Sequence, residues 1–409
     1  MTTNATQSNT QKIPKLRFPG FSGKWEEKKL GETLKQEIRE IPKPDKSYMA
    51  IGIRSHFKGT FQKPDSDPRK INMENLFIVK EDDLIVNITF AWEGAVAIVK
   101  KEDEGGLVSH RFPAYVFNKN ITSPKYFQFI FPNKKTKYRL TNISPGGAGR
   151  NRVLNKKDFL KLTFDFPSLP EQQKIADFLG AVDEWIDNLK SQKEFLEGYK
   201  RGMMQKIFSQ EIRFRNEDGS EFPEWEEKKL GEVGNFLGGG TPSKNIENFW
   251  KGNIPWVSSS DVSDKDFEIS ITRFITDDAI EKSATKIIPK DSLLIVSRVG
   301  VGKIAISNVD ICTSQDFTNF LPDKNFNVLF GAFLLKNKSK ILLSFNQGTS
   351  IKGFTKDDLV SLKINLPSLP EQQKIADFLS SIDNLIEAKS AEIEKAEEWK
   401  KGVMQGVFV

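Results

Sequence analysis

The chain is poor in the residues that build metal centres and disulfide frameworks. Its 409 residues include one cysteine, Cys312, and two histidines, His56 and His110. A disulfide within the chain is therefore excluded, as are zinc sites made of four cysteines or of two cysteines and two histidines. The near absence of cysteine indicates a reducing compartment, and we expect a cytoplasmic protein.

Long hydrophobic runs are also missing. No segment approaches the ~20 apolar residues that a membrane-spanning helix needs, and the polar first twelve residues have no apolar core typical of a secretory signal. Apolar residues nevertheless make up 38% of the chain and charged residues 28%. These proportions indicate a folded protein with a buried core and no membrane association, and the length allows two or three domains.

Motifs for catalysis are incomplete. Phe236–Gly240 fits the loose F-x-G-x-G pattern of methyltransferase cofactor loops, but the chain has no [DNS]-P-P-[YF] tetrapeptide to accompany it. Gly300–Lys303 ends in Gly-Lys, but Ile304 stands where a P-loop has Ser or Thr. Both histidines lie in the other half of the chain from Cys312, which favours a buried, inert thiol. We expect a chain that is not an enzyme by itself and holds no cofactor or metal; a stand-alone methyltransferase is the alternative.

What the sequence does contain is a long internal repeat. The string WEEKKLGE occurs at Trp25–Glu32 and at Trp225–Glu232, and PSLPEQQKIADFL occurs at Pro167–Leu179 and at Pro367–Leu379. Each match has the same offset of 200 residues. The pattern predicts a tandem duplication with pseudo-two-fold symmetry.

Between the repeated strings the two halves diverge. Thr33–Phe166 and Val233–Leu366 share only a framework of β-rich runs, within which Ser109–Phe112 (SHRF) matches Ser314–Phe317 (SQDF). A common scaffold with different polar residues predicts two domains that bind two different targets. The nearly identical segments beside them predict two copies of one partner, or one structural role.

Each copy of the longer string is predicted to begin a helix. Ser168–Glu171 and Ser368–Glu371 have the S-x-x-E spacing of a capping box, with proline in the first turn. Apolar residues then recur every seven residues, as in a coiled coil. In the first helix, one row holds Ile175, Val182, Leu189, Leu196 and Met203, and the second holds Phe178, Trp185 and Tyr199. In the second helix, the rows hold Ile375, Ile382, Ala396 and Val403, and Phe378, Leu385 and Trp399.

Each helix would span ~40 residues, or ~60 Å at 1.5 Å per residue. Because each alone exposes an apolar seam, we expect the two helices to pair, and the symmetry of the duplication predicts antiparallel pairing. Lys389 and Glu392 interrupt the rows of the second helix. They either set the register or point to solvent where the helices diverge. Docking of each helix on a separate partner stays open for the remaining faces.

The net charge is unevenly distributed. The whole chain carries +6, but Thr33–Phe166 carries +9, Val233–Leu366 carries +2 and the remainder carries −5. A basic surplus in the variable segments favours contacts with phosphates. The densest basic run is Lys134–Arg139, and Arg150 and Arg152 follow a glycine-rich turn. A solvated face is the alternative interpretation of such a run.

Together these motifs resemble the specificity (S) subunits of type I restriction–modification systems. The resemblance rests on the PSLPEQQKIADFL string, its repetition after a variable domain and the long helix after each copy. In addition, Gly238–Val262 (GGGTPSKNIENFWKGNIPWVSSSDV) is similar to the start of many target-recognition domains of that family. The similarity covers the chain from about Leu16 to Val409.

The resemblance implies an α+β fold, a tandem pseudo-two-fold duplication with two β-rich mixed target-recognition domains separated by two long antiparallel coiled-coil helices. We place the first domain with its lead-in at 16–166, the first spacer helix at 167–210, the linker and second domain at 211–366, and the second spacer helix at 367–409. Each domain would recognise one half of an asymmetric, split site in double-stranded DNA.

The same resemblance implies partners that carry out the chemistry. Two modification (M) subunits would dock on the repeated segments and methylate adenine at N6 with S-adenosylmethionine. Two restriction (R) subunits would supply a translocase and nuclease that depend on ATP and Mg. The alternative is a coiled-coil scaffold that assembles two copies of a protein partner without sequence-specific DNA binding.

Positions that match between the halves but differ in kind are the candidates for base contacts, because each base pair presents its own donors and acceptors in the major groove. His110 and Arg111 match Gln315 and Asp316, and Arg54 falls opposite Asp261. The predicted DNA contacts are Arg54, His110, Arg111, Lys134, Lys135, Lys137, Arg139, Arg150, Arg152, Ser258, Ser259, Ser260, Asp261, Lys303, Gln315, Asp316 and Lys352. The predicted partner contacts are identical in both helices: Gln172, Gln173, Lys174 and Asp177, and Gln372, Gln373, Lys374 and Asp377.

Overall fold

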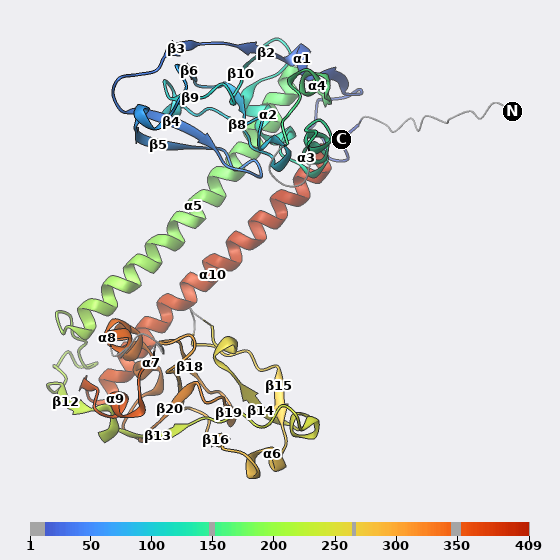
Figure 1. The fold of residues 1–409 in the computed structure, drawn as a ribbon. Coiled ribbons are helices and arrows are strands. Elements are labelled where there is room, and N and C mark those ends of the chain that lie inside the picture. The colour runs from blue at the N-terminus through green and yellow to red at the C-terminus, as the bar shows by residue number, and fades with distance from the viewer. Residues whose placement is uncertain (1–12, 147–151, 264–266, 345–352, 409) are drawn as a thin grey trace. The chain divides into compact units, whose positions relative to one another are not determined.

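Runs of buried aliphatic residues form the central strands of each half, because a strand covered on both faces has no solvent-facing position for polar side chains. The clearest are β7 (Leu84–Val86) and β17 (Leu293–Val296), in which every residue is buried. The computed structural model describes residues 13–146, 152–263, 267–344 and 353–408. It divides into two units, Met1–Asn188 with Ile393–Val409, and Leu189–Glu392 (Figure 1).

The first unit contains sheets with strand orders β2-β10-β7-β8, β3-β6-β9-β4-β5 and β1-β11. Only the β4–β9 pair in them is parallel. The strands are β1 (Glu26–Lys29), β2 (Leu34–Glu37), β3 (Glu40–Pro42), β4 (Tyr48–Ile53), β5 (Thr60–Ser66), β6 (Asn75–Ile78), β7, β8 (Val96–Ile98), β9 (Leu107–Val108), β10 (Ala114–Phe117) and β11 (Thr163–Phe166).

The second unit repeats this topology, except that among its described residues no strand corresponds to β3. Its sheets have the orders β13-β20-β17-β18, β15-β14-β19-β16 and β12-β21, and the β14–β19 pair is parallel. The strands are β12 (Glu226–Lys229), β13 (Gly234–Gly238), β14 (Ile254–Val257), β15 (Arg273–Ile275), β16 (Ile287–Ile288), β17, β18 (Ile304–Ile306), β19 (Ile311–Thr313), β20 (Phe317–Pro322) and β21 (Lys363–Leu366). The predicted duplication, with a shared framework of β-rich runs, is confirmed.

Short helices cover these sheets, and most begin at a side chain that caps them. Asn133 and Asn327 accept hydrogen bonds from backbone N–H groups of the first turn, at 2.7 and 2.9 Å, as N-cap residues do. The short helices are α1 (Leu30–Thr33), α2 (Pro124–Ile130), α3 (Lys134–Asn142) and α4 (Lys156–Lys161) in the first unit, and α6 (Asp277–Glu281), α7 (Val328–Asn337), α8 (Ser339–Ser344) and α9 (Lys356–Val360) in the second.

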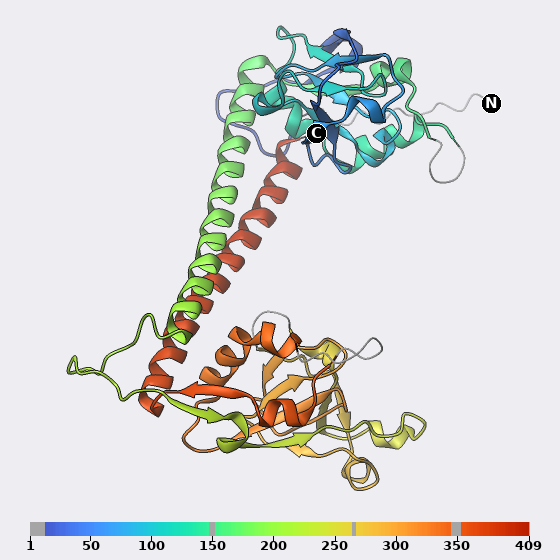
Figure 2. The same cartoon turned by 60° about the vertical axis from the view of Figure 1, so that its left-hand side comes forward.

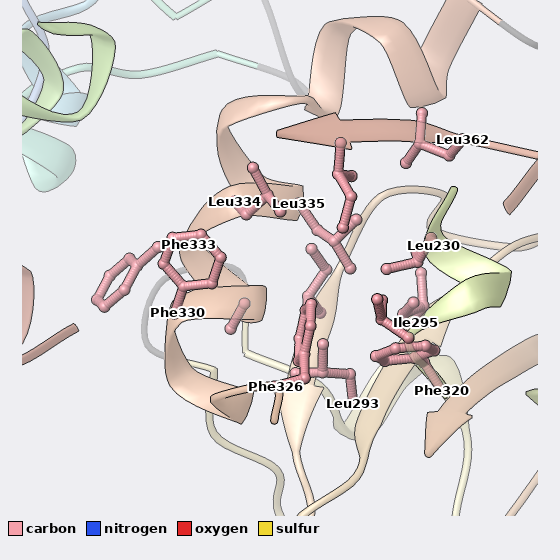
Figure 3. Close-up of a cluster of buried hydrophobic side chains, with 14 of the residues drawn as sticks. Leu230, Leu293, Ile295, Phe320, Phe326, Phe330, Phe333, Leu334, Leu335 and Leu362 are labelled. Atoms are coloured by element: carbon pink, nitrogen blue, oxygen red, sulfur yellow. The ribbon is translucent and has the colours of Figure 1, made fainter. Parts of the chain in front are cut away.

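An aromatic core lies between sheet and helices in each unit. In the second unit, Phe320 of β20 packs against Phe326, whose ring also contacts Phe330 of α7 (Figure 3). Phe330 and Phe333 are fully buried beside Leu293 and Ile295 of β17. Each such side chain contributes roughly 1.5–3 kcal/mol through burial. These contacts hold α7 rigidly on the sheet.

Two long helices, α5 (Leu169–Phe208) and α10 (Leu369–Val407), follow the repeated strings. Parts of both belong to each unit, and within each unit they run side by side and antiparallel (Figures 1 and 2). In the first unit Val407 packs near Ile175 and Leu179, whereas Lys400 pairs with Asp183 further along α5. The predicted antiparallel pairing is confirmed within each unit.

The apolar seam differs from the predicted one in its second row. The first row is confirmed over part of its length: Ile175, Val182 and Leu189 are buried, whereas Leu196 and Met203 are half-buried. The second row lies one residue later than predicted: Leu179 and Ile186 are buried, whereas their neighbours Phe178 and Trp185 are not. Tyr199, Leu385 and Trp399 of the predicted row are likewise 44%, 54% and 49% exposed. Spacings of three and four alternate in both arrangements, so the heptad pattern alone does not separate them.

The shifted row explains a pair of ion pairs in the helices. Lys200 pairs with Asp383 in the second unit, and Lys400 pairs with Asp183 in the first. The four residues are related by the same offset of 200. Each ammonium also lies over a phenylalanine ring, Phe333 at 4.8 Å and Phe129 at 5.7 Å from the ring centroid. Lys389, for which two positions were open, is half-buried and pairs with Glu392 at 2.8 Å.

The capping boxes predicted at the starts of α5 and α10 are not formed by the two glutamates. Glu171 is buried and accepts hydrogen bonds from Arg17 at 2.8 Å on both carboxylate oxygens. Glu371 is fully buried and is bound in the same way by Arg213, at 3.3 and 3.1 Å. Each glutamate therefore ties a lead-in segment to its helix, because a buried carboxylate requires a charged partner.

Candidate nucleic-acid interface

The turn that carries the SHRF string is joined to two other loops of the first unit. The Ile88 N–H donates to the carbonyl oxygen of Arg111 at 3.0 Å, and the Leu154 N–H donates to the carbonyl oxygen of Ile88 at 2.8 Å. Ile88 follows β7, Arg111 precedes β10 and Leu154 precedes α4. One residue therefore holds three loops together, and we call this arrangement the loop joint.

The second unit has the same loop joint. The Ser297 N–H donates to the carbonyl oxygen of Asp316 at 2.8 Å, and the Phe354 N–H donates to that of Ser297 at 3.1 Å. Arg111 and Asp316 therefore occupy equivalent positions on one backbone framework. The side chain at this position is positively charged in the first unit and negatively charged in the second. The two loop joints therefore differ in charge at the same backbone position.

The neighbouring residues are also accessible in part. His110 and Arg111 are exposed, as is Gln315, whose side-chain oxygen accepts a hydrogen bond from the Thr241 hydroxyl. Asp316 is half-buried and accepts a hydrogen bond from the Ser314 hydroxyl at 3.2 Å. Within each unit, the two matched residues thus lie in the turn that carries the SHRF or SQDF string.

Further cations of the first unit surround the loop of residues 87–94. Lys137 of α3 lies 3.1 Å from Nδ1 of His56, and the guanidinium of Arg152 lies over the ring of Trp92 at 5.4 Å. The Thr141 hydroxyl donates to the carbonyl oxygen of Trp92 at 3.3 Å. These contacts bring α3 and Arg152 to the loop joint, as expected for a basic surface that contacts phosphates.

Two other residues of the basic run, Lys135 and Arg139, lie on another side of α3. Arg139 is turned toward the sheet: its Nη1 donates to the carbonyl oxygen of Thr163 at 2.6 Å, and it lies over Phe164 at 5.6 Å. Lys135 is exposed on the same side of the helix, four residues before Arg139. The predicted phosphate contact of Arg139 is therefore corrected to a structural role, whereas Lys134 remains an exposed candidate.

The predicted alignment of Arg54 with Asp261 between the two halves is off by one residue. Ala50 of β4 pairs with Leu107, and Trp256 of β14 pairs with Cys312, in the two parallel strand pairs. Because Leu107 and Cys312 match in the sequence alignment, Arg54 falls opposite Ser260. Arg54 is exposed, but its guanidinium donates to the carbonyl oxygen of Thr60 and lies 5.2 Å from the Phe61 centroid.

The serine cluster of the second unit is only partly available. Ser259 is 8% exposed, which contradicts its prediction as a base contact. The Asp261 carboxylate accepts hydrogen bonds from the backbone and side chain of Ser258, at 2.6 and 3.0 Å, and pairs with Arg273. These contacts all fall on Oδ2, and the carboxylate side chain is 15% exposed, so one oxygen is used inside the unit while the contact with cytosine stays a prediction. Ser260 is exposed.

Of the remaining predicted DNA contacts, the structure describes Lys303 but not Arg150 or Lys352. Lys303 is half-buried and donates to the carbonyl oxygen of Val262 at 3.3 Å, which favours a structural role. A surface hollow of about 750 Å³ beside the second loop joint is lined by Gln315 and by Arg298 and Lys356. The sequence analysis did not single out these two cations, although Lys356 has a charged counterpart 200 residues earlier, Lys156.

The glycines of the Phe236–Gly240 segment have a packing role. A Cβ atom on Gly239 would lie 2.1 Å from the carbonyl oxygen of Ser314, so only glycine lets these two segments approach. The carbonyl oxygen of Gly240 accepts a hydrogen bond from the Trp256 indole at 2.9 Å. The resemblance of this segment to a cofactor loop therefore has a structural explanation.

The glutamines predicted to contact partners are not equivalent. Gln172 and Gln372 are 1% exposed, and their amide groups donate to the carbonyl oxygens of Pro167 and Pro367, each at 2.9 Å. Buried side chains of this kind lock the start of each helix, and their predicted docking role is corrected. Gln173, Lys174 and Asp177 are exposed, as are Gln373 and Asp377, whereas Lys374 is half-buried and donates to the carbonyl oxygen of Arg215 at 2.8 Å.

Apolar residues on the long helices are exposed at matched positions. Trp185 and Leu385 are related by the repeat, as are Tyr199 and Trp399, and all four are more than 40% exposed. Sequence reasoning had placed them in the helix seam, so it missed them as candidates for partner contact. Trp185 and Trp399 thus leave large apolar rings partly at the surface, at positions whose counterparts in the repeat are also apolar and exposed.

Cys312 is fully buried, and desolvation raises the pKa of its thiol to about 11. The described residues contain no group of three or more His, Cys, Asp or Glu side chains placed to hold a metal ion. Across the described part of the chain, none of the helices combines the length and apolar character required to cross a membrane.

The fold and the duplicated loop joints place the chain among DNA specificity proteins. The family model described as the type I restriction modification DNA specificity domain matches residues 23–197 and again residues 223–398. These two matches cover most of the chain, one in each half. The chain therefore belongs to this family.

Relatives within the family extend the comparison. The chain is 34% identical over 208 residues to the type I restriction enzyme MjaIX specificity subunit of Methanocaldococcus jannaschii, in a match that spans about half of either chain. It is 27% identical to the MjaVIII specificity subunit of the same organism, across 97% of this chain and 94% of the relative. The fold is similar to that of the type I restriction–modification S subunit from M. genitalium, with a TM-score of 0.58, 17% identity, and coverage of 97% and 99% of the two chains.

Proposed function

We propose that this chain is the non-catalytic DNA-recognition subunit of a type I restriction–modification complex, in which each unit recognises one half of an asymmetric, split site. The observation that carries the proposal is the loop joint, which is built identically in both units but presents Arg111 in one and Asp316 in the other. Arginine is the usual partner of guanine, and a carboxylate accepts from cytosine N4. Equivalent positions with opposite charge suit half-sites of different sequence.

The charge distribution supports DNA as the ligand. Thr33–Phe166 carries +9, and two of its cations lie beside the loop that contains Ile88 of the first loop joint: Arg152 lies over Trp92, and Lys137 contacts His56, whose backbone N–H donates to the carbonyl oxygen of Glu93. Phosphate contacts of this kind position a protein on the duplex, and base contacts then specify the sequence. A scaffold that binds only protein partners has no need of either feature.

The partners follow from the repeated surfaces of the helices. We infer that two M subunits dock on the exposed apolar positions, Trp185 and Trp399 in the first unit and Leu385 and Tyr199 in the second. In this assembly the M subunits bind S-adenosylmethionine and methylate adenine at N6, and R subunits add ATP- and Mg-dependent translocation and cleavage. This chain supplies recognition without a cofactor of its own.

Domain exchange tests the function. Val233–Leu366 is replaced by the corresponding segment of another specificity subunit, and the hybrid is expressed with the M subunit. Methylome sequencing should show a new sequence in one half of the split site and an unchanged sequence in the other half. A change in both halves, or methylation without any defined site, would contradict recognition by separate domains.

The salt dependence of DNA binding distinguishes the proposed function from a scaffold that binds only protein partners. Because counterions are released when cations meet phosphates, binding of cognate DNA by the complex should weaken by orders of magnitude between 50 and 200 mM salt. The variant Lys134→Gln/Lys137→Gln, which removes two of the candidate phosphate contacts, should reduce the slope by about two. A complex that binds DNA without salt dependence, or not at all, favours a protein scaffold.

A further inference from the structure

Arg273 of β15 is held in place from two sides. Its guanidinium lies over the Trp256 ring, 4.7 Å from the centroid. Nη2 donates to the Ser258 hydroxyl at 2.8 Å and pairs with the Asp261 carboxylate. Stacking and ion pairing together remove most of the rotational freedom of this side chain before any ligand binds.

The fixed guanidinium is not consumed by these contacts. Guanidinium carries five N–H donors on three nitrogens, and the hydrogen bonds of Arg273 to other described residues involve Nη2. The side chain is 37% exposed, so it reaches the surface. Nη1 and Nε make none of these hydrogen bonds, so donors are left for a ligand that reaches the exposed part of the side chain.

Arg273 also lies next to the loop joint. The Ser314 N–H donates to the carbonyl oxygen of Val257 at 2.9 Å, which joins the end of β14 to the turn that carries Gln315 and Asp316. Ser258, the next residue after Val257, is the residue that Arg273 contacts. The arginine is thus on the same surface region as the matched turn.

The first unit has a counterpart built from the opposite strand. There Arg54 follows β4 and lies over Phe61 of β5, at 5.2 Å. In the second unit the arginine is on β15 and the ring on β14. Both units therefore hold an arginine against an aromatic ring on the outer strand pair beside β9 or β19, although no sequence alignment matches the two arginines.

We propose that Arg273 contacts a guanine in the half-site recognised by the second unit, with Asp261 as the residue that positions it. A fixed, planar guanidinium matches O6 and N7 of guanine, which is the commonest specific contact in the major groove. The assignment rests on the proposed function and adds a specificity-determining residue to it. In this role Asp261 acts through Arg273.

The test is methylome sequencing of complexes that contain Arg273→Lys or Arg273→Gln. Lysine keeps the charge opposite Asp261 but lacks the paired donors. Discrimination at one G·C pair of the second half-site should fall about 10–100-fold, while the first half-site stays unchanged. Arg215→Lys is the matched control, because Arg215 forms an exposed ion pair with Glu221 at 3.0 Å in the same unit, and its sequence preference should stay unchanged.

Each other outcome decides against the assignment. If both variants keep the full sequence preference, Arg273 only neutralises Asp261. If both lose affinity equally for all sequences, with a smaller salt slope, Arg273 contacts a phosphate. A wild-type complex that methylates a split site lacking any G·C pair in the second half overturns the assignment but leaves the proposed function intact.

If the Arg273 variants do not fold, a measurement on the wild-type complex still tests the guanine contact. Arginine-specific modification by phenylglyoxal, read by mass spectrometry, should spare Arg273 when cognate DNA is bound. DNA with that G·C pair replaced should leave Arg273 reactive. Equal protection by both DNAs would contradict a guanine contact.

Discussion

At the scale of the residue, the fold sorts similar side chains into different roles. Arg111 and Arg139 are both basic residues of the first variable segment, yet one is exposed at the loop joint and the other binds the carbonyl oxygen of Thr163. Gln172 and Gln173 are adjacent and identical, yet only the first is buried. The role of each follows from the groups that surround it, which lie far away in the sequence.

Cys312 provides a prediction about residue environment. Because the thiol is fully buried and its pKa is raised to about 11, it should not react with iodoacetamide at pH 8 in the native state. In denaturant one thiol per chain should react. The folded pKa lies above the unfolded value of about 8.5. The stability that the protein gains by keeping this thiol protonated is therefore fully present below about pH 8.5 and is lost as the pH rises toward 11.

Labelling kinetics followed by mass spectrometry provide the measurement. A Cys312→Ser variant, which has no thiol, is the control for reaction at other groups. Rapid stoichiometric labelling of the native chain at pH 8 would show that Cys312 is accessible and that this part of the core opens readily.

At the scale of the element, the long helices combine an apolar seam with charges at fixed points. Lys200 and Lys400 occupy the second row of the seam and pair with Asp383 and Asp183. An ion pair inside a helical seam sets the register because any shift leaves a charge against apolar neighbours. The seam is thereby specified at two symmetric points.

Charge reversal tests this role. Asp383→Lys places two cations together and should lower the free energy of unfolding by about 1–3 kcal/mol. The double exchange Lys200→Asp/Asp383→Lys should recover part of the loss, since it restores the pair but removes the contact of Lys200 with Phe333. Asp183→Lys, at the matched position, should cost a similar amount. Urea unfolding of the wild type, Asp383→Lys, Lys200→Asp and the double exchange gives the coupling energy of the pair. Additive effects would mean that the pair does not couple the helices.

At the scale of the whole molecule, duplication gives each unit one loop joint and one set of exposed apolar helix residues. Under the proposed function, identical partners bind twice while the DNA contacts differ between the units. This division explains why the repeated strings are unchanged while the loop joints carry Arg111 and Asp316.

Stoichiometry tests the two docking surfaces. Trp185→Ser/Trp399→Ser should lower the number of bound M subunits from two to one, because half of the exposed apolar positions are removed. Leu385→Ser/Tyr199→Ser should have the same effect, and all four changes together should abolish docking. Phe195→Ser is the matched control: it is 71% exposed, but the repeat has Lys395 at the corresponding position. Native mass spectrometry distinguishes the species, and two bound M subunits in every variant would place docking elsewhere.

The amino-acid sequence alone determined the features that depend on repetition and periodicity. Exact strings 200 residues apart establish the duplication, and the seven-residue spacing of Ile175, Val182 and Leu189 establishes the first row of the helix seam. The matched SHRF and SQDF strings located the loop joint, because strands and the turns between them preserve spacing even when side chains change.

Only the tertiary structure decided which side chains face inward. Leu179 rather than Phe178 completes the seam, and Glu171 meets Arg17, 154 residues away, rather than capping its own helix. Arg273 is held by Trp256 and Asp261 across a strand pair that no repeat marks. Local spacing fixes the direction of a side chain relative to its own backbone, whereas burial and ion pairing depend on the segments that pack against it.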